Sequence, residues 1–153
     1  VIAAMKKYSE VWAFKHPSPW DYMFFMNKEL DQNLEWFWYY WLWTTESVEG
    51  SIQNVKTGGT TEVTVHQAGE MPSPVVLKVE FETSGPKIKS MKNAVMVDDN
   101  TAIVTFPVDV WFNGNRTYKA KLSFGGRKIS KITLDPAGRF PDKDARDNVW
   151  TNK

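Results

Sequence analysis

The sequence predicts an α+β protein in which N-terminal helices pack on an antiparallel β-sandwich. Two observations support this fold class. Apolar residues first recur at spacings of three and four, as on a helix face, and from about Ser51 they recur at every second position, as in strands. Turn-forming residues separate these short segments, with no helical pattern between them. We therefore expect a helical segment over residues 1–46, a sandwich over residues 47–135 and an irregular C-terminal tail over residues 136–153.

The composition is that of a globular chain with a core. Of 153 residues, 42% are hydrophobic and 24% are charged, which is ordinary for a folded domain. Basic residues exceed acidic ones by one (19 against 18) without forming a block, so we expect no nucleic-acid partner. The absence of cysteine excludes disulfides and thiolate zinc ligands. No apolar run reaches the roughly 20 residues of a membrane span.

Three helices are expected in the first segment. The spacing of apolar residues predicts the first helix over residues 2–14. The second should run from Pro19 to Leu30, because proline is well suited to a first helical position. Ser18 is placed to cap it, and Asp21 falls three residues later, as in a capping box with the shorter acid. Asn33 is the expected cap of the third helix.

Residues His16, Pro17 and Ser18 form the expected junction between the first two helices. Pro17 ends the first helical pattern because proline disfavours helical backbone in the residue before it. His16 has no histidine partner at helical spacing, and the other histidine of the chain is His66. We therefore expect His16 to fix the turn by hydrogen bonding and not to bind a metal.

The third helix carries an unusual density of aromatic side chains. Seven of the eight residues from Trp36 to Trp43 are aromatic, Leu42 being the exception. A helix that is apolar nearly all round is expected to be buried on most sides, although a sheet face bearing such rings could instead stack on sugars. We interpret this segment as core or interdomain packing. The candidate packing or interface residues are Trp36, Phe37, Trp38, Trp41 and Trp43.

Six candidate strands follow, separated by glycine, proline, asparagine and aspartate turns. Alternation of solvent-facing and buried positions is clearest in the second and fifth candidate strands, which indicates two packed antiparallel layers. The candidates are Ser51–Lys56, Thr61–Gln67, Val75–Glu82, Thr101–Phe112 with a break at Pro107, Arg116–Phe124 and Lys128–Leu134.

Catalytic patterns are not found in the sequence. There is no His-Glu-x-x-His pair, no Gly-x-Ser-x-Gly elbow, and no phosphate or dinucleotide loop. Paired acids occur at Glu80 with Glu82 and at Asp98 with Asp99, and we interpret them as solvated strand and turn residues. We therefore predict no catalytic, cofactor-binding or metal-binding residue in this chain.

Several sequence segments, in the same order, resemble the end of bacterial aminopeptidase N-like gluzincins. In that family a lysine-histidine-proline turn leads into a helix, an acidic linker and a helix with an aromatic tryptophan pattern. The matching segments are VWAFKHPSPWDYM (11–23), LEWFWYYWLWTT (34–45), GEMPSPV (69–75), ITLDPAGRFPD (132–142) and NVW (148–150). Tyr39-Tyr40 and Ser73 depart from the residues common in the family, which leaves the subfamily open.

The resemblance implies a zinc metallopeptidase whose zinc ligands lie before Val1, so no catalytic residue of the family falls on this chain. The chain would be a non-catalytic, C-terminal structural part that packs against and supports the N-terminal catalytic domain of the same parent, where zinc is expected. The resemblance favours an exported bacterial protein. Without that domain, the helix over residues 1–14 should expose an apolar patch and allow self-association.

Two other classes of function remain open from the sequence. A secreted carbohydrate- or protein-binding β-sandwich would expose aromatic residues on a sheet face, for example Trp111, Phe112 and Tyr118, although Trp111 and Phe112 cannot both point inward. A small hydrolase that uses aspartate and glutamate would keep its turnover when zinc is chelated.

Overall fold

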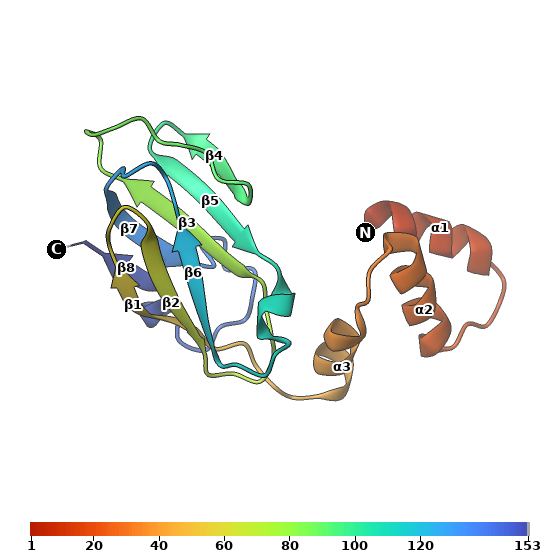
Figure 1. The fold of residues 1–153 in the computed structure, drawn as a ribbon. Coiled ribbons are helices and arrows are strands. Elements are labelled where there is room, and N and C mark those ends of the chain that lie inside the picture. The colour runs from red at the N-terminus through yellow and green to blue at the C-terminus, as the bar shows by residue number, and fades with distance from the viewer. Residues whose placement is uncertain (153) are drawn as a thin grey trace. The chain divides into compact units, whose positions relative to one another are not determined.

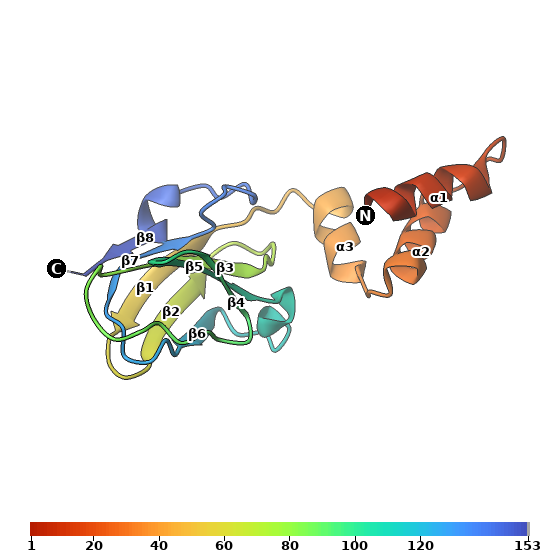
Figure 2. The same cartoon turned by 90° about the horizontal axis from the view of Figure 1, so that it is seen from above.

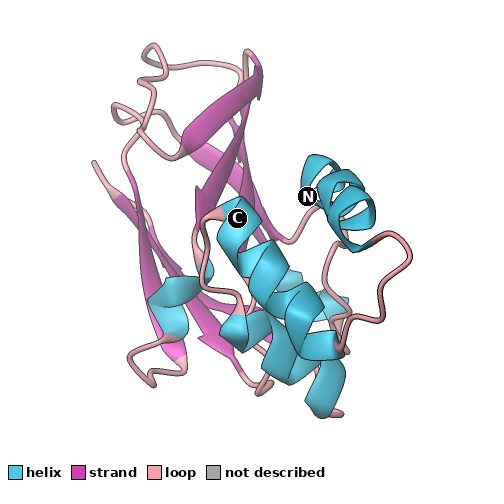
Figure 3. Ribbon diagram, turned by 90° about the vertical axis from the view of Figure 1, so that its right-hand side faces the viewer, coloured by secondary structure: helices cyan, strands magenta, loops and turns pink. Residues whose placement is uncertain are grey.

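The computed structural model describes residues 1–152, and the chain divides into two compact units. The first, the helical unit, is Val1–Thr45, and the second, the sandwich unit, begins at Glu46. All strands belong to the sandwich unit (Figure 1; magenta in Figure 3). The predicted α+β class, with N-terminal helices and an antiparallel β-sandwich, is confirmed.

The helical unit contains α1 (Ile2–Trp12), α2 (Pro19–Leu30) and α3 (Glu35–Trp43). Helix α1 packs on α2 through the ring of Tyr8, which makes edge contacts with Tyr22 and Phe25 at centroid distances of 4.9 and 5.3 Å. Such aromatic pairs add to the free energy gained from burial alone.

The sandwich unit has two antiparallel sheets (Figure 2). The three-stranded sheet has the order β1 (Gly50–Lys56), β2 (Thr61–Gln67), β6 (Thr117–Leu122). The five-stranded sheet has the order β4 (Ala94–Asp98), β5 (Thr101–Phe106), β3 (Val75–Phe81), β7 (Ile129–Leu134), β8 (Val149–Thr151). Two short 3₁₀ helices accompany them, η1 (Val108–Trp111) and η2 (Ala145–Asn148).

The core lies between the two sheets. Along β2 and β3 every second residue is buried, so each strand presents one face to the core. Fully burying an aliphatic side chain stabilises a fold by about 1.5–3 kcal/mol, and residues from both sheets share one hydrophobic cluster. Its largest fully buried side chains are Leu77, Leu122, Ile132, Val63, Val65, Val75, Val79 and Val104.

Three parts of the sandwich unit differ from the prediction. Ala94–Asp98 forms the edge strand β4, which the sequence pattern missed because most of its residues are exposed and do not alternate. The tail predicted to be irregular over residues 136–153 contains β8, which pairs with β7. The strand predicted to continue after Pro107 is replaced by η1, because proline interrupts strand pairing.

Arg127 fastens the loop between β3 and β4 to the sandwich. Its guanidinium donates to the carbonyl oxygens of Glu82 (2.9 Å), Gly85 (3.1 Å) and Pro86 (3.1 Å), and to Asn100 Oδ1 (3.0 Å). The planar, permanently charged group can hold several acceptors at fixed angles. The loop is therefore tied to the strand ends by one side chain.

Residues 47–49, at the start of the sandwich unit, are bound to the segment after β2. The carbonyl oxygen of Glu49 accepts from the backbone N–H groups of Ala68 (2.8 Å) and Gly69 (3.2 Å), and that of Ser47 accepts from Met71 (3.3 Å). A Cβ atom at position 69 would clash with the oxygen of Ser47 and lie 2.7 Å from the nitrogen of Glu49. Glycine is needed here because the two backbones approach so closely.

We expect Leu77→Ala to lower the free energy of unfolding by about 2–5 kcal/mol, because it removes a fully buried side chain from the centre of the core. The matched control, Val95→Ala on the exposed edge strand, should change it by less than about 0.5 kcal/mol. Urea denaturation of the whole chain measures both. Equal effects would contradict a core placed between the sheets.

Candidate interaction site

The junction between α1 and α2 contains the predicted capping box. The Ser18 backbone N–H donates to Asp21 Oδ2 (2.8 Å), and the Asp21 N–H donates to Ser18 Oγ (3.3 Å). The Ser18 hydroxyl also donates to Asp21 Oδ2 (2.6 Å). These bonds, above all the side-chain bond from Ser18, hold the pKa of Asp21 below its ordinary value of 3.8. Ser18 thus sets the start of α2.

The expected role of His16 is not found in the turn. Its side chain and that of Pro17 are exposed, and the hydrogen bonds of the turn come from Lys15. The Lys15 N–H donates to the carbonyl oxygen of Trp12 (3.0 Å), and Lys15 Nζ donates to that of Val11 (2.7 Å). The turn closes through the backbone and a lysine, which the sequence did not indicate.

The cap of α3 also lies one residue from its predicted position. The N-cap is Leu34, and Asn33 Oδ1 accepts from the Glu35 N–H (3.0 Å) from just outside the helix. An asparagine that bonds two residues onward makes an Asx turn. Asn33 therefore still contributes to starting α3.

Helix α3 is not buried in this chain, contrary to the prediction. None of its residues is buried, and Tyr39, Trp41, Leu42 and Trp43 are exposed. The expectation rested on a helix that is apolar on all sides, and such a helix needs covering. Residues 1–152 leave much of this aromatic surface open to solvent.

The aromatic side chains of α3 contribute to two surfaces. Ring contacts join Trp36, Phe37 and Trp41, and we call these three residues the outer face of α3. On it, Phe37 stacks on Trp41 at a centroid distance of 5.5 Å and meets the edge of Trp36 at 5.8 Å. The second surface is turned toward α2.

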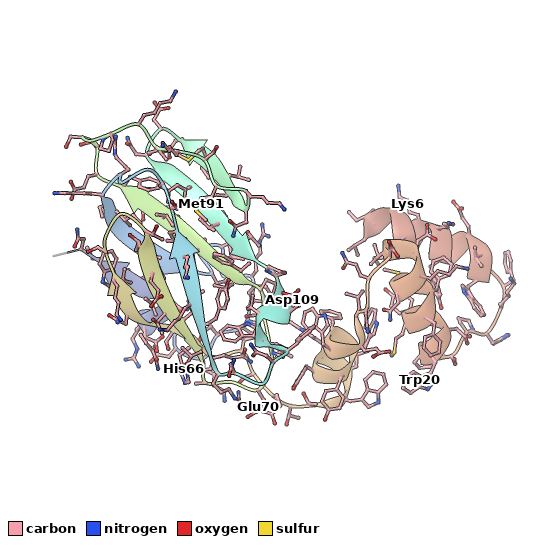
Figure 4. The ribbon with its side chains drawn as sticks, viewed as in Figure 1. Lys6, Trp20, His66, Glu70, Met91 and Asp109 are labelled. Atoms are coloured by element: carbon pink, nitrogen blue, oxygen red, sulfur yellow. The ribbon has the colours of Figure 1, made fainter. Side chains whose placement is uncertain are left out.

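A cavity of about 440 Å³ lies between α2 and α3, and we call it the aromatic groove. Trp20 of α2, labelled in Figure 4, stacks on Trp43 of α3 at a centroid distance of 5.3 Å. Trp38 Nε1 donates to Asn27 Oδ1 (2.8 Å), which fixes the indole ring. The lining residues are Trp20, Met23, Phe24 and Asn27 from α2, and Glu35, Trp38, Tyr39 and Trp43 from α3.

Of the predicted packing residues, the structure thus places Trp36, Phe37 and Trp41 on the outer face of α3, and Trp38 and Trp43 in the aromatic groove. The contribution of α2 to the groove was missed. Trp20 and Phe24 lie four positions apart in the sequence, and this helical spacing could have indicated an aromatic face on α2.

Helix α1 and the turn after it expose further apolar side chains. The residues are Ile2, Met5, Val11 and Phe14. An apolar patch was expected along the helix over residues 1–14, but Ile2 and Val11 lie nine residues apart, on opposite sides of α1, so the exposed side chains do not share one face. Exposed apolar patches favour association with a partner or with a second copy.

The acids and the histidine of the sandwich unit have structural surroundings. Glu80 pairs with Lys78 (3.1 Å), and Asp98 Oδ1 accepts from the Asn100 N–H (2.8 Å) in a turn. His66, labelled in Figure 4, lines a cavity of about 20 Å³, room for about one water molecule. Within residues 1–152, no three His, Asp or Glu side chains are grouped so that they could hold a metal ion.

Acidic side chains also gather where the C-terminal segment meets β1. Asp142 Oδ2 accepts from the Gly50 N–H (3.3 Å) and from Asn148 Nδ2 (2.9 Å), which ties this segment to the strand. Loss of hydration, together with Asp142, raises the pKa of Glu49. Hydrogen bonds from Arg146 lower the pKa of Asp144 to about 2.

The aromatic sheet face expected of a binding module is not formed. Trp111 is buried, and its Nε1 donates to the Ser73 carbonyl oxygen (2.9 Å). Tyr118 packs against Trp111 at a centroid distance of 6.1 Å. Of the three candidates only Phe112 is exposed.

Comparisons of the chain with protein-family models, with curated proteins and with solved structures returned no match. In the described residues, no helix combines the length and the apolarity needed to cross a membrane.

We expect Ser18→Ala to destabilise the helical unit by about 0.5–2 kcal/mol through loss of the helix cap, and to raise the pKa of Asp21, because the hydrogen bonds from Ser18 lower it. Thermal unfolding and NMR titration of the carboxyl groups measure the two effects. Ser9→Ala on α1 is the control and should leave the pKa of Asp21 unchanged.

The pair Ser18 and Asp21 also predicts how the stability of the helical unit depends on pH. A carboxyl whose pKa is lower in the folded state stabilises the fold above its unfolded pKa, and this contribution is lost as the pH falls through the folded pKa. The destabilising effect of Ser18→Ala should therefore shrink as Asp21 becomes protonated, below pH 3.8. An effect that grows on acidification would contradict the assignment.

Proposed function

We propose that this chain is the non-catalytic, C-terminal structural part of a zinc-dependent, aminopeptidase-like metallopeptidase. Its partner is the N-terminal catalytic domain of the same parent chain, which holds the zinc ion. The observation that carries the proposal is the aromatic surface of α3, which residues 1–152 leave largely uncovered. The partner is inferred from the series of motifs that resembles the end of bacterial gluzincins.

The outer face of α3 is the main contact in this proposal. Trp36 meets the edge of Phe37, and Phe37 stacks on the exposed Trp41, so these ring contacts exist before a partner binds. Each large side chain that becomes fully buried contributes about 1.5–3 kcal/mol. Preformed aromatic clusters of this kind are typical centres of protein interfaces.

Helix α1 supplies a second contact in the proposal. Its exposed Ile2, Met5 and Val11 would be covered by the same catalytic domain. In the isolated chain, the uncovered residues would favour self-association.

The sandwich unit has a supporting role in this proposal. Its acids Asp98, Glu80 and Asp142 serve a turn, an ion pair and a strand end, so the proposal assigns turnover to the catalytic domain and not to this chain alone. An exported bacterial location follows from the resemblance.

We expect purified 1–153 to contain no stoichiometric zinc and to release no amino acid from peptides. A longer chain that includes the upstream region should bind zinc and act as an aminopeptidase. Metal analysis and peptide turnover, measured side by side, test both statements. Stoichiometric zinc or zinc-dependent turnover in the short chain would overturn the proposal.

We expect Trp41→Ala to cost less than about 1 kcal/mol of stability in the isolated chain, where the side chain is exposed. In the longer chain it should cost about 3–5 kcal/mol, as for a buried tryptophan. Phe112→Ala, an exposed aromatic residue of the sandwich unit, is the control and should have the same effect in both chains. Chemical denaturation measures all four values. A Trp41→Ala cost that is equal in both chains would show that this face stays uncovered.

A further inference from the structure

We propose that the aromatic groove between α2 and α3 binds an organic cation, specifically a quaternary ammonium group. The proposal is independent of the parent's catalytic activity. It rests on the size of the groove, on its exposed aromatic rings and on one carboxylate in its lining.

The groove has the dimensions of a small-ligand site. Its volume of about 440 Å³ falls in the range of about 300–1,000 Å³ that is usual for such sites. Four aromatic residues line it with half or more of their surface exposed, namely Trp20 (56%), Phe24 (65%), Tyr39 (58%) and Trp43 (50%). These rings therefore retain surface that a ligand can cover.

The charge of the groove favours a cation. Glu35 is the one charged residue among its described lining residues, and within residues 1–152 no basic side chain pairs with it. The adjoining depression adds Lys28 and Asp31, whose charges offset each other. Aromatic rings also attract cations through the negative potential of their faces.

The hydrogen-bonding groups of the groove favour a cation without N–H donors. The side-chain oxygen of Asn27 already accepts from Trp38 Nε1, so few acceptors remain besides Glu35. A lysine ammonium brings three N–H donors and an arginine guanidinium brings five, all of which need acceptors. A quaternary ammonium group brings none, and its methyl groups can pack on the rings.

The groove can serve alongside the proposed interdomain contact. Its lining residues on α3 lie on the face toward α2, whereas Trp36, Phe37 and Trp41 form the outer face. Because Trp36, Phe37 and Trp41 are not lining residues of the groove, a partner that covers them does not have to occupy it.

Titration calorimetry of the whole chain with choline and with its neutral isostere 3,3-dimethylbutanol tests the proposal. We expect choline to bind about fivefold or more tightly than the isostere, because only the cation is attracted by the rings and by Glu35. Equal binding of the two compounds, or no binding of choline, would overturn it. Vesicles of phosphatidylcholine form a second arm: binding to them assigns the cation to a lipid headgroup, and binding to free choline alone assigns it to a soluble ligand.

Single substitutions complete the test, and two of them each remove one negative charge. Glu35→Gln should weaken choline binding about fivefold and leave the isostere unaffected, whereas Glu10→Gln on α1 should leave both unaffected. Trp43→Leu should weaken the binding of both choline and the isostere, because it removes ring surface from the groove. Circular dichroism checks that each variant is folded. If Glu35→Gln and Glu10→Gln act alike, the groove does not hold the cation. Zinc content and peptide turnover of the longer chain are separate measurements, so failure here leaves the proposed function untouched.

Discussion

The sandwich unit depends on the alternation of buried and solvent-facing residues in β2 and β3. Val63 and Val65 of β2 face the core from one sheet, and Leu77 and Val79 of β3 face it from the other. A slip of one residue in either strand would turn these side chains to solvent. This alternation holds the strand ends in register. The loops, the hydrogen bonds of Arg127 and the attachment of the C-terminal segment all depend on those strand ends.

The helical unit is organised differently, because its residues bury little surface among themselves. Only Ala4, Met23 and Met26 are buried hydrophobic residues in it, and helices of this length are marginal without packing partners. Many of its aromatic residues instead lie on two open surfaces, the outer face of α3 and the aromatic groove. In the two proposals made above, the first surface meets a catalytic domain and the second binds a small cation, so a single nine-residue helix would take part in two kinds of recognition.

Local patterns in the sequence predicted most of the fold, and the exceptions have physical reasons. The capping box at Ser18 and the strands with strict alternation were found because their signals are local. The strand Ala94–Asp98 was missed because an edge strand exposed on both faces has no alternation to detect. The prediction that α3 is buried was wrong, because burial depends on what covers a helix and not on its sequence alone. The aromatic groove was missed because its walls come from two helices, and neither sequence segment by itself shows how the two pack.

The close approach at Gly69 has a consequence for how this chain can evolve. The backbone around Ser47 and Glu49 fills the space where any side chain at position 69 would begin, although the position carries no chemistry of its own. Every substitution would have to push apart two hydrogen-bonded segments. In a set of descendants of this sequence, position 69 should therefore drift far more slowly than its exposed neighbours Ala68 and Glu70.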